Sequence, residues 1–204
     1  MGRTPTSVQE ATWPRFFEDQ ARRCRDPVLR GFYAAGLPVP STPIGEVEMV
    51  ALDFETTGLD VHQHAIVSVG IVPFTLERIR PAAGYYWVVR PPRPLDESSI
   101  RFHRITHAEV NAAPDLEAIL DELLTILAGK IVVVHYQGIE RPFLDAAVID
   151  RRGERCLFPV IDTMRLEAEE VRRGWWTRLR GFFGASPTSR SEERRVGKEC
   201  ATGC

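Results

Sequence analysis

The sequence predicts an α/β domain in which helices flank a mixed five-stranded sheet. Three strand-like apolar runs follow one another directly, and a helix–strand–helix–strand order follows them. The chain has 204 residues, of which 44% are hydrophobic and 26% are charged. This length and composition are enough for one globular domain with a core of its own and some flanking sequence.

The expected strands and helices follow from the apolar pattern. Residues 131–134 are continuously apolar, which is typical of an interior strand. Leu and Ile recur at helical spacing over residues 114–128, and Gly129 ends that helix. The remaining expected strands are residues 47–54, 65–74, 84–89 and 157–161, and the remaining expected helices are residues 143–149 and 163–172.

Three regions are expected along the chain. Residues 1–46 read as a helical appendage, with an apolar stripe that starts at Trp13, followed by a proline-rich linker. Residues 47–173 hold the α/β domain. Residues 174–204 lack apolar periodicity and are expected to be an irregular tail, and the last dozen resemble translated vector sequence.

The net charge and the placement of the cysteines indicate which kinds of binding site and cross-link the sequence does not favour. The formal net charge is −2, which argues against binding of nucleic acid by bulk positive charge. The four cysteines are scattered without a C-x-x-C pair, so the sequence indicates neither a zinc site nor a disulfide framework. With no apolar run of membrane-spanning length and no secretory signal, we expect a cytoplasmic protein.

Two carboxylates stand at the end of the first strand, in the string Asp53-Phe54-Glu55-Thr56-Thr57-Gly58. Side chains alternate along a strand, so Asp53 and Glu55 share one face, about 7 Å apart. Acids this close are costly away from water unless a positive charge lies between them. Mg²⁺ or Mn²⁺ supplies such a charge and prefers hard oxygen ligands. A bare pair of acids would also suit a solvated strand end, but the complete string favours a metal site.

The same string carries a family resemblance. It is similar to the first motif of the DEDD exonucleases of the proofreading-subunit type, whose members share a ribonuclease H-like fold. The segment Phe102-His103-Arg104-Ile105-Thr106 resembles the histidine-containing element before the family's long helix. Residues 135–144 resemble the second motif, typically His-Asn-Ala-x-Phe-Asp, and Ile161-Asp162-Thr163 matches a later signature. The resemblance covers residues 47–166 and implies a ribonuclease H-like mixed five-stranded sheet.

The resemblance also implies a chemistry. Asp53 and Glu55 would be direct metal ligands, and Glu140, in place of the second-motif aspartate, would hold a second ion. Two Mg²⁺ or Mn²⁺ ions about 4 Å apart would activate a water and stabilise the leaving 3′ oxygen. The implied reaction is 3′–5′ removal of nucleotides from DNA. A single-stranded 3′ end is then the substrate, and a polymerase is a further expected partner.

Several residues around these carboxylates are implied as substrate contacts, and each has a structural alternative. His135 also suits a satisfied structural histidine, Asp162 suits a helix N-cap, and Glu140 suits an exposed acid at a helix start. The implied contacts are Thr56, Thr57, Gly58, His103, Thr106 and His135, with Asp162 as a secondary candidate near the metal.

One family element has no counterpart in the sequence. The third motif is His or Tyr followed five residues later by Asp, and the chain has no histidine after His135. His103 and His107 come too early to replace it. We therefore expect a domain truncated before this motif, with slow or absent hydrolysis. Two alternatives stay open: an RNA-trimming exonuclease of the same superfamily, and a domain that binds a nucleic-acid end and metal without turnover.

Overall fold

The structure is a computed structural model that describes residues 13–92 and 105–172. The chain divides into two units, Met1–Met164 and Arg165–Cys204. The second unit is helical over its described residues, 165–172, in line with the helix expected there. The sheet and all other elements belong to the first unit.

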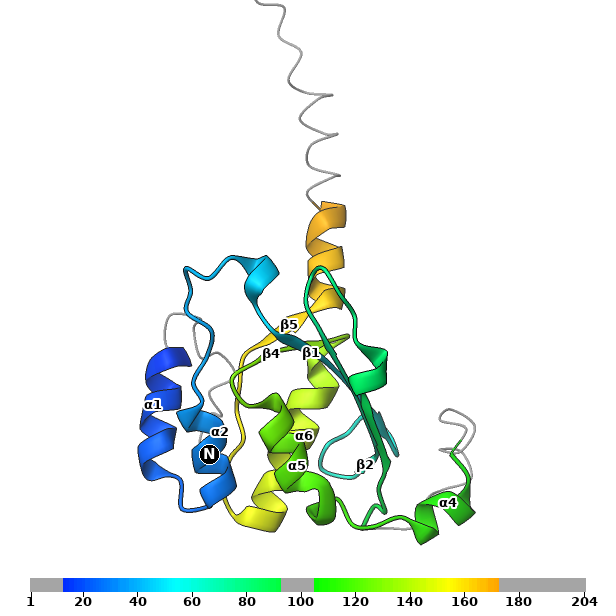
Figure 1. Cartoon of the computed structure of the whole chain (residues 1–204). Helices are drawn as coiled ribbons and strands as arrows, with labels where there is room; N and C mark the ends of the chain where they lie inside the picture. The colour runs from blue at the N-terminus through cyan, green and yellow to red at the C-terminus, as the bar shows by residue number, and fades with distance from the viewer. Residues whose placement is uncertain (1–12, 93–104, 173–204) are drawn as a thin grey trace, which may run out of the picture. The chain divides into compact units, whose positions relative to one another are not determined.

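A five-stranded mixed sheet forms the centre of the first unit (Figure 1). Its strand order is β3-β2-β1-β4-β5, so β1 is the central strand. β1 pairs antiparallel with β2 and parallel with β4, which makes the sheet mixed as the sequence predicts. The strands are β1 Met49–Thr56, β2 Ile66–Phe74, β3 Tyr85–Val88, β4 Ile131–Val134 and β5 Val160–Asp162.

The alternation of side chains in β1 decides which residues face the core. Leu52 and Phe54 are buried in the main hydrophobic cluster, whereas Asp53 between them is exposed. Such an alternation is typical of a strand with one covered and one open face. The pairing of β1 with β2 shifts register between Glu55 and Thr56. An irregularity of this kind redirects side chains, and Thr56 is buried while Glu55 is half-buried.

Helices cover the core face of the sheet. α5 (Glu117–Leu127) buries five aliphatic side chains, and α6 (Gln137–Arg152) packs on β1. The helix expected over residues 143–149 is α6, and its expected start is wrong, because α6 begins six residues earlier, at Gln137, and contains Pro142. A further helix, α4 (His107–Ala112), was not predicted. It begins with a capping box between Thr106 and Glu109. Short 3-10 turns occur elsewhere in the chain, at Ile44–Glu46 (η2) and Pro81–Ala83 (η3).

The two N-terminal helices share this core. α1 (Trp13–Arg23) and α2 (Pro27–Ala34) lie side by side, and α2 also contacts α5 (Figure 1). Their buried residues belong to the same hydrophobic cluster as the sheet residues. The helices expected as an appendage are therefore packed into the first unit. The domain boundaries at residues 46 and 173 remain predictions. The buried members from these helices are Trp13, Phe17, Leu29, Phe32 and Tyr33.

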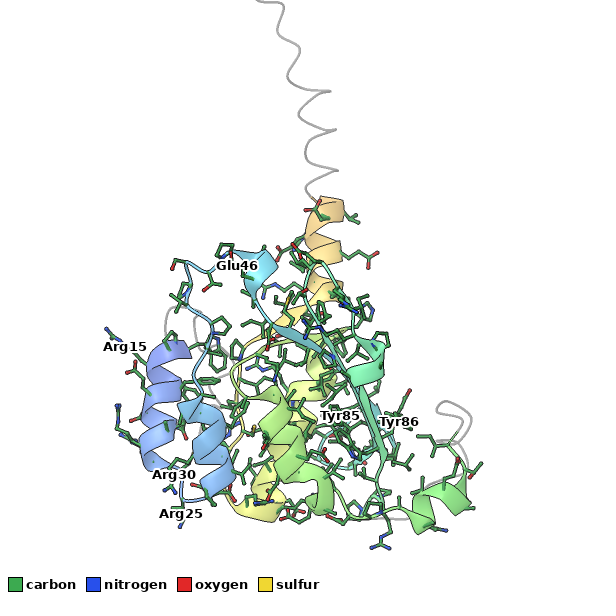
Figure 2. The ribbon with its side chains drawn as sticks, in the orientation of Figure 1. Arg15, Arg25, Arg30, Glu46, Tyr85 and Tyr86 are labelled. Atoms are coloured by element: carbon green, nitrogen blue, oxygen red, sulfur yellow. The ribbon has the colours of Figure 1, made fainter. Side chains whose placement is uncertain are left out.

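The exposed surface carries cations and aromatic rings. Three exposed arginines project outward: Arg15 on α1, Arg25 in the turn between α1 and α2, and Arg30 on α2 (Figure 2). Tyr86 is 65% exposed on β3, which is an edge strand of the sheet. None of the helices in the described ranges is long and apolar enough to cross a membrane.

An ion-pair network fixes the C-terminal end of α6. The guanidinium of Arg152 donates to Asp26 at 2.8 Å, and it also pairs with Asp121 at 2.7 Å and Glu117 at 2.8 Å. Asp26 in turn caps α2, because its carboxylate accepts from the backbone N–H groups of Val28 and Leu29. One arginine therefore ties α6 to α2 and α5.

We predict that Arg152→Met lowers the free energy of unfolding by about 2 kcal/mol, because Asp26 is left largely buried without its cation. The matched control is Arg23→Met, which removes an exposed i,i+4 pair with Asp19 and is expected to cost less than about 0.5 kcal/mol. Urea unfolding at pH 7 measures both. Equal losses in the two variants would contradict the anchoring role of Arg152.

The stabilisation that the Asp26 carboxylate contributes is predicted to depend on pH. Burial opposes the charge of Asp26, but hydrogen bonds from the Leu29 N–H and from Arg152 outweigh it and hold the pKa below its usual 3.8. The folded state thus binds the proton less tightly than the unfolded state, so the stabilisation is complete above the unfolded pKa and is lost as pH falls through the folded pKa.

Asp26→Asn keeps the cap but removes the charge, which makes it the variant for this test. Its deficit in unfolding free energy relative to the unaltered chain is expected to be constant from pH 8 to about 5 and to shrink below about pH 4. Urea titrations across this range measure it. A deficit that grows toward acid pH would be the wrong sign.

Candidate functional site

The site begins where β1 ends. Asp53 is exposed and Glu55 is half-buried on the face opposite the main core. The chain then turns tightly, because the hydroxyl of Thr56 donates to the carbonyl oxygen of Gly58 at 2.8 Å. The N–H of Thr57 donates to the carbonyl of Ala65 at 2.9 Å, which closes the loop before β2. The two carboxylates are thus followed by a hydrogen-bonded turn.

Glu140 lies in the first turn of α6 and is 2% exposed. Its Oε2 atom is buried without a hydrogen-bond partner. Burial raises the pKa of Glu140 to about 7; its own backbone N–H opposes the rise, while the negative charges of Asp53 and Asp162 add to it. Glu140 is therefore a buried acid rather than the exposed helix-start acid that was the alternative. The like charge of Asp53 acts on Glu140, so the first turn of α6 lies near the end of β1.

Asp162 holds the start of α6 in place. Its carboxylate accepts from the N–H of Tyr136 at 3.1 Å and from the N–H of Gln137 at 3.0 Å. It also accepts from the N–H of Met164 at 3.0 Å, which caps the following helical segment. This negative charge lies at the positive end of the α6 dipole. The capping alternative for Asp162 thus describes its observed contacts.

His135 is exposed, and its Nδ1 atom lies 2.9 Å from the hydroxyl of Thr163. That hydroxyl donates its proton to the carbonyl of Val134 at 3.1 Å. A hydroxyl has one proton to donate, so Nδ1 of His135 is the donor to Thr163 and the ring is held in the Nδ1–H form. His135 is therefore tied to the strand ends beside α6.

The backbone at the entrance to α6 is strained. Tyr136 has φ 91° and ψ 86°, a left-handed conformation that is uncommon for a bulky residue. Its ring lies so close to Gly138 that a Cβ there would approach the ring carbon Cζ to 2.7 Å. The family's second motif typically has Asn at this position, and Asn tolerates positive φ better than Tyr.

Trp13 of α1 contacts Arg141 of α6. The guanidinium of Arg141 lies 5.5 Å from the ring centroid of Trp13, and its Nε atom is buried without a hydrogen-bond partner. A cation over an indole face is attracted by the ring quadrupole. Arg141 follows Glu140 directly in the sequence, so α1 contacts α6 close to its first turn.

The other predicted site residues are placed less centrally or not described. Thr106 is the N-cap of α4 and bonds with Glu109, and His103 lies outside the described residues. Within the described ranges, no group of three or more acidic, histidine or cysteine side chains is gathered for a metal ion. Joint metal binding by Asp53, Glu55 and Glu140 therefore stays a proposal.

Comparison with known proteins gives the family. A family model described as "Exonuclease" matches residues 50–172, more than half of the chain. The chain belongs to this exonuclease family. The predicted resemblance to proofreading exonucleases is thereby confirmed, and so is the predicted mixed sheet of the ribonuclease H-like class.

Several similar curated proteins are named as DNA polymerase III or as one of its subunits. The PolC-type DNA polymerase III of Thermotoga maritima is 30% identical over 122 residues, which cover 60% of this chain and 9% of that protein. DNA polymerase III subunit epsilon of Pasteurella multocida is 24% identical over 110 residues, which cover 51% of this chain and 43% of that subunit. The exonuclease chain thus spans less than half the length of these relatives.

Among solved structures, a full-length 3′-exonuclease is 19% identical with a TM-score of 0.45, and the match covers 55% of this chain and 42% of that one. The nuclease domain of 3′hExo, bound to rAMP, is 18% identical with a TM-score of 0.44. That match covers 52% of this chain and 60% of the 3′hExo chain.

The strain at Tyr136 leads to a prediction. Tyr136→Asn is expected to raise the free energy of unfolding by about 1 kcal/mol, because Asn adopts positive φ at lower cost. Tyr136→Ala keeps the unfavourable φ and loses the ring contact with Gly138, so it serves as the control and is expected to bring no gain. Urea unfolding compares the three chains, and a less stable Asn variant would contradict the assignment of strain.

Proposed function

We propose that this exonuclease chain removes nucleotides from the 3′ end of single-stranded DNA by metal-dependent hydrolysis. Asp53, Glu55 and Glu140 are the proposed metal ligands. The observation that supports this is the buried Oε2 of Glu140, which has no hydrogen-bond partner, in a carboxyl group that the like charge of Asp53 also acts on. A buried carboxylate oxygen without a donor is costly, and a cation would compensate it.

The donor set fits a hard divalent cation. All three proposed ligands are carboxylates, and Mg²⁺ and Mn²⁺ prefer oxygen ligands. In our proposal Asp53 and Glu55 hold one ion and Glu140 holds a second. Bound ions of this kind lower the pKa of a coordinated water and offset the charge that develops on a phosphate.

The protein's own part in the reaction is to hold the substrate and the acids in place. In our proposal the nucleotide at the 3′ end lies against the turn of Thr56, Thr57 and Gly58. This turn is pre-formed by the hydrogen bond from the Thr56 hydroxyl to the Gly58 carbonyl, so little ordering remains for substrate binding. Asp162 keeps the first turn of α6, and with it Glu140, in position.

The relatives support DNA as the substrate and a polymerase as a partner. The similar curated proteins are named as DNA polymerase III PolC-type and DNA polymerase III subunit epsilon. In our proposal the exonuclease domain spans residues 47–173 and meets its substrate at a single-stranded end. RNA, the alternative substrate, differs at the 2′-hydroxyl, so paired DNA and RNA substrates separate the two.

The chain as it stands is proposed to be a slow enzyme. The sequence has no histidine after His135, so the third-motif base that takes a proton from the attacking water has no counterpart. A positioned general base is typically worth about 10²–10⁴ in rate. The second candidate function, binding of a nucleic-acid end without turnover, is favoured by the same observation.

The test is hydrolysis of a 5′-labelled single-stranded DNA, and of the RNA of the same sequence, under single-turnover conditions with Mn²⁺. We expect slow stepwise shortening from the 3′ end of DNA, which Asp53→Ala and Glu140→Gln reduce by at least about tenfold through weaker metal binding. The control is Glu122→Gln, which changes an exposed acid on α5 and is expected to leave the rate unchanged.

Calorimetric titration with Mn²⁺ separates the two candidate functions. Metal binding that Asp53→Ala abolishes, together with DNA binding but no shortening, would favour the binding function. Equal Mn²⁺ affinity of the unaltered chain and both variants would refute the metal site. Shortening of RNA alone would replace DNA as the substrate.

A further inference from the structure

The loop between β1 and β2 folds back on the turn that follows Glu55. The Ala65 N–H donates to the Thr57 hydroxyl at 3.1 Å, while the Thr57 N–H donates to the Ala65 carbonyl at 2.9 Å. The His64 N–H donates to the Asp60 carbonyl at 2.8 Å. These bonds place the imidazole of His64 next to Thr57 and Gly58.

The imidazole of His64 fills the space that a side chain at position 58 would take. A Cβ atom on Gly58 would lie 2.6 Å from both Cε1 and Nε2 of the ring and 2.7 Å from Cδ2. Such distances are far shorter than any ordinary carbon contact, so the ring packs directly on the Gly58 backbone. The same ring is anchored at its other side, where Nδ1 lies 3.2 Å from the Thr57 hydroxyl.

We propose that His64 is a positioning residue for the substrate nucleotide. It holds the backbone of Thr57 and Gly58 in the conformation that receives the 3′-terminal nucleotide, and it makes no contact with the reacting atoms. The inference rests on the proposed function, which places the nucleotide against this turn. It adds a residue from outside the family motifs to that site.

Two observations distinguish this role from that of a core or solvated histidine. His64 is half-buried, and its side-chain hydrogen-bonding contact is with the hydroxyl of Thr57 in the turn. His62, two residues earlier in the same loop, is exposed and offers a matched comparison. Of these two histidines, His64 is the one with a polar contact to Thr57 and with its ring against Gly58.

A residue that orders a binding turn acts on affinity more than on the chemical step. We expect His64→Ala to raise KM for single-stranded DNA about tenfold, from the loss of one hydrogen bond and its packing, with kcat changed less than about twofold. His64→Asn can place an amide atom where Nδ1 lies, so it is expected to recover most of the affinity. His62→Ala is expected to match the unaltered chain.

The contact between the His64 ring and Gly58 can be tested by combining substitutions at the two positions. Its φ is not positive, so alanine there brings no backbone strain, but its Cβ would displace the imidazole. Gly58→Ala is therefore expected to raise KM as much as His64→Ala does. Combined with His64→Ala, it is expected to add less than about twofold, because the displaced ring is already absent. Additive effects of the two changes would overturn the proposal.

Affinity for DNA is measured separately from hydrolysis, so the two proposals can fail independently. The probe is a fluorescent single-stranded oligonucleotide with a free 3′ end, bound in Ca²⁺ by the full chain. If hydrolysis is absent but binding is present, the enzymatic function fails while the same variant series in Kd still tests His64. Equal Kd for the unaltered chain and His64→Ala would overturn the role of His64, and no binding by any chain would overturn both proposals.

Discussion

The buried carboxylate of Glu140 is the constraint on which the rest of the candidate site depends. An acid that is 2% exposed, with one oxygen lacking a donor, is expensive to hold in place. A free helix end would relieve this cost by fraying and exposing the acid to water. α6 must therefore be held at both of its ends and from the side, and the structure contains an anchor for each.

Asp162 is the anchor at the N-terminal end, since it accepts from two N–H groups there. Arg152 is the anchor at the C-terminal end, through its ion pairs with α2 and α5. Trp13 supplies a lateral contact by packing on Arg141, the residue that follows Glu140 in α6. This explains why α1 and α2 belong to the same core as the sheet, because both helices provide support for the helix that carries the acid.

Much of this arrangement could be predicted from sequence because it depends on local periodicity. The presence of the five strands and the placement of Asp53 and Glu55 on one face of the first strand follow from apolar runs and alternation, whereas the central position of β1 comes from the structure. α4 was missed although its capping box, Thr106 with Glu109, is readable in the sequence. The contact of His64 with Gly58 has no such signal, because it is created by the return of the loop from β1 to β2 and not by spacing along the chain.

The early start of α6 shows how tertiary contacts override a local signal. Proline inside a helix removes one N–H and crowds the carbonyl four residues earlier, which disfavours a helix that continues through Pro142. In α6 that carbonyl belongs to Gly138, and the space that a side chain there would need is taken by the Tyr136 ring. The bonds from Asp162 fix the preceding N–H groups, and strain is concentrated at Tyr136. A helix that began at residue 143 would leave Glu140 in a loop, with no reason to be buried beside Asp53.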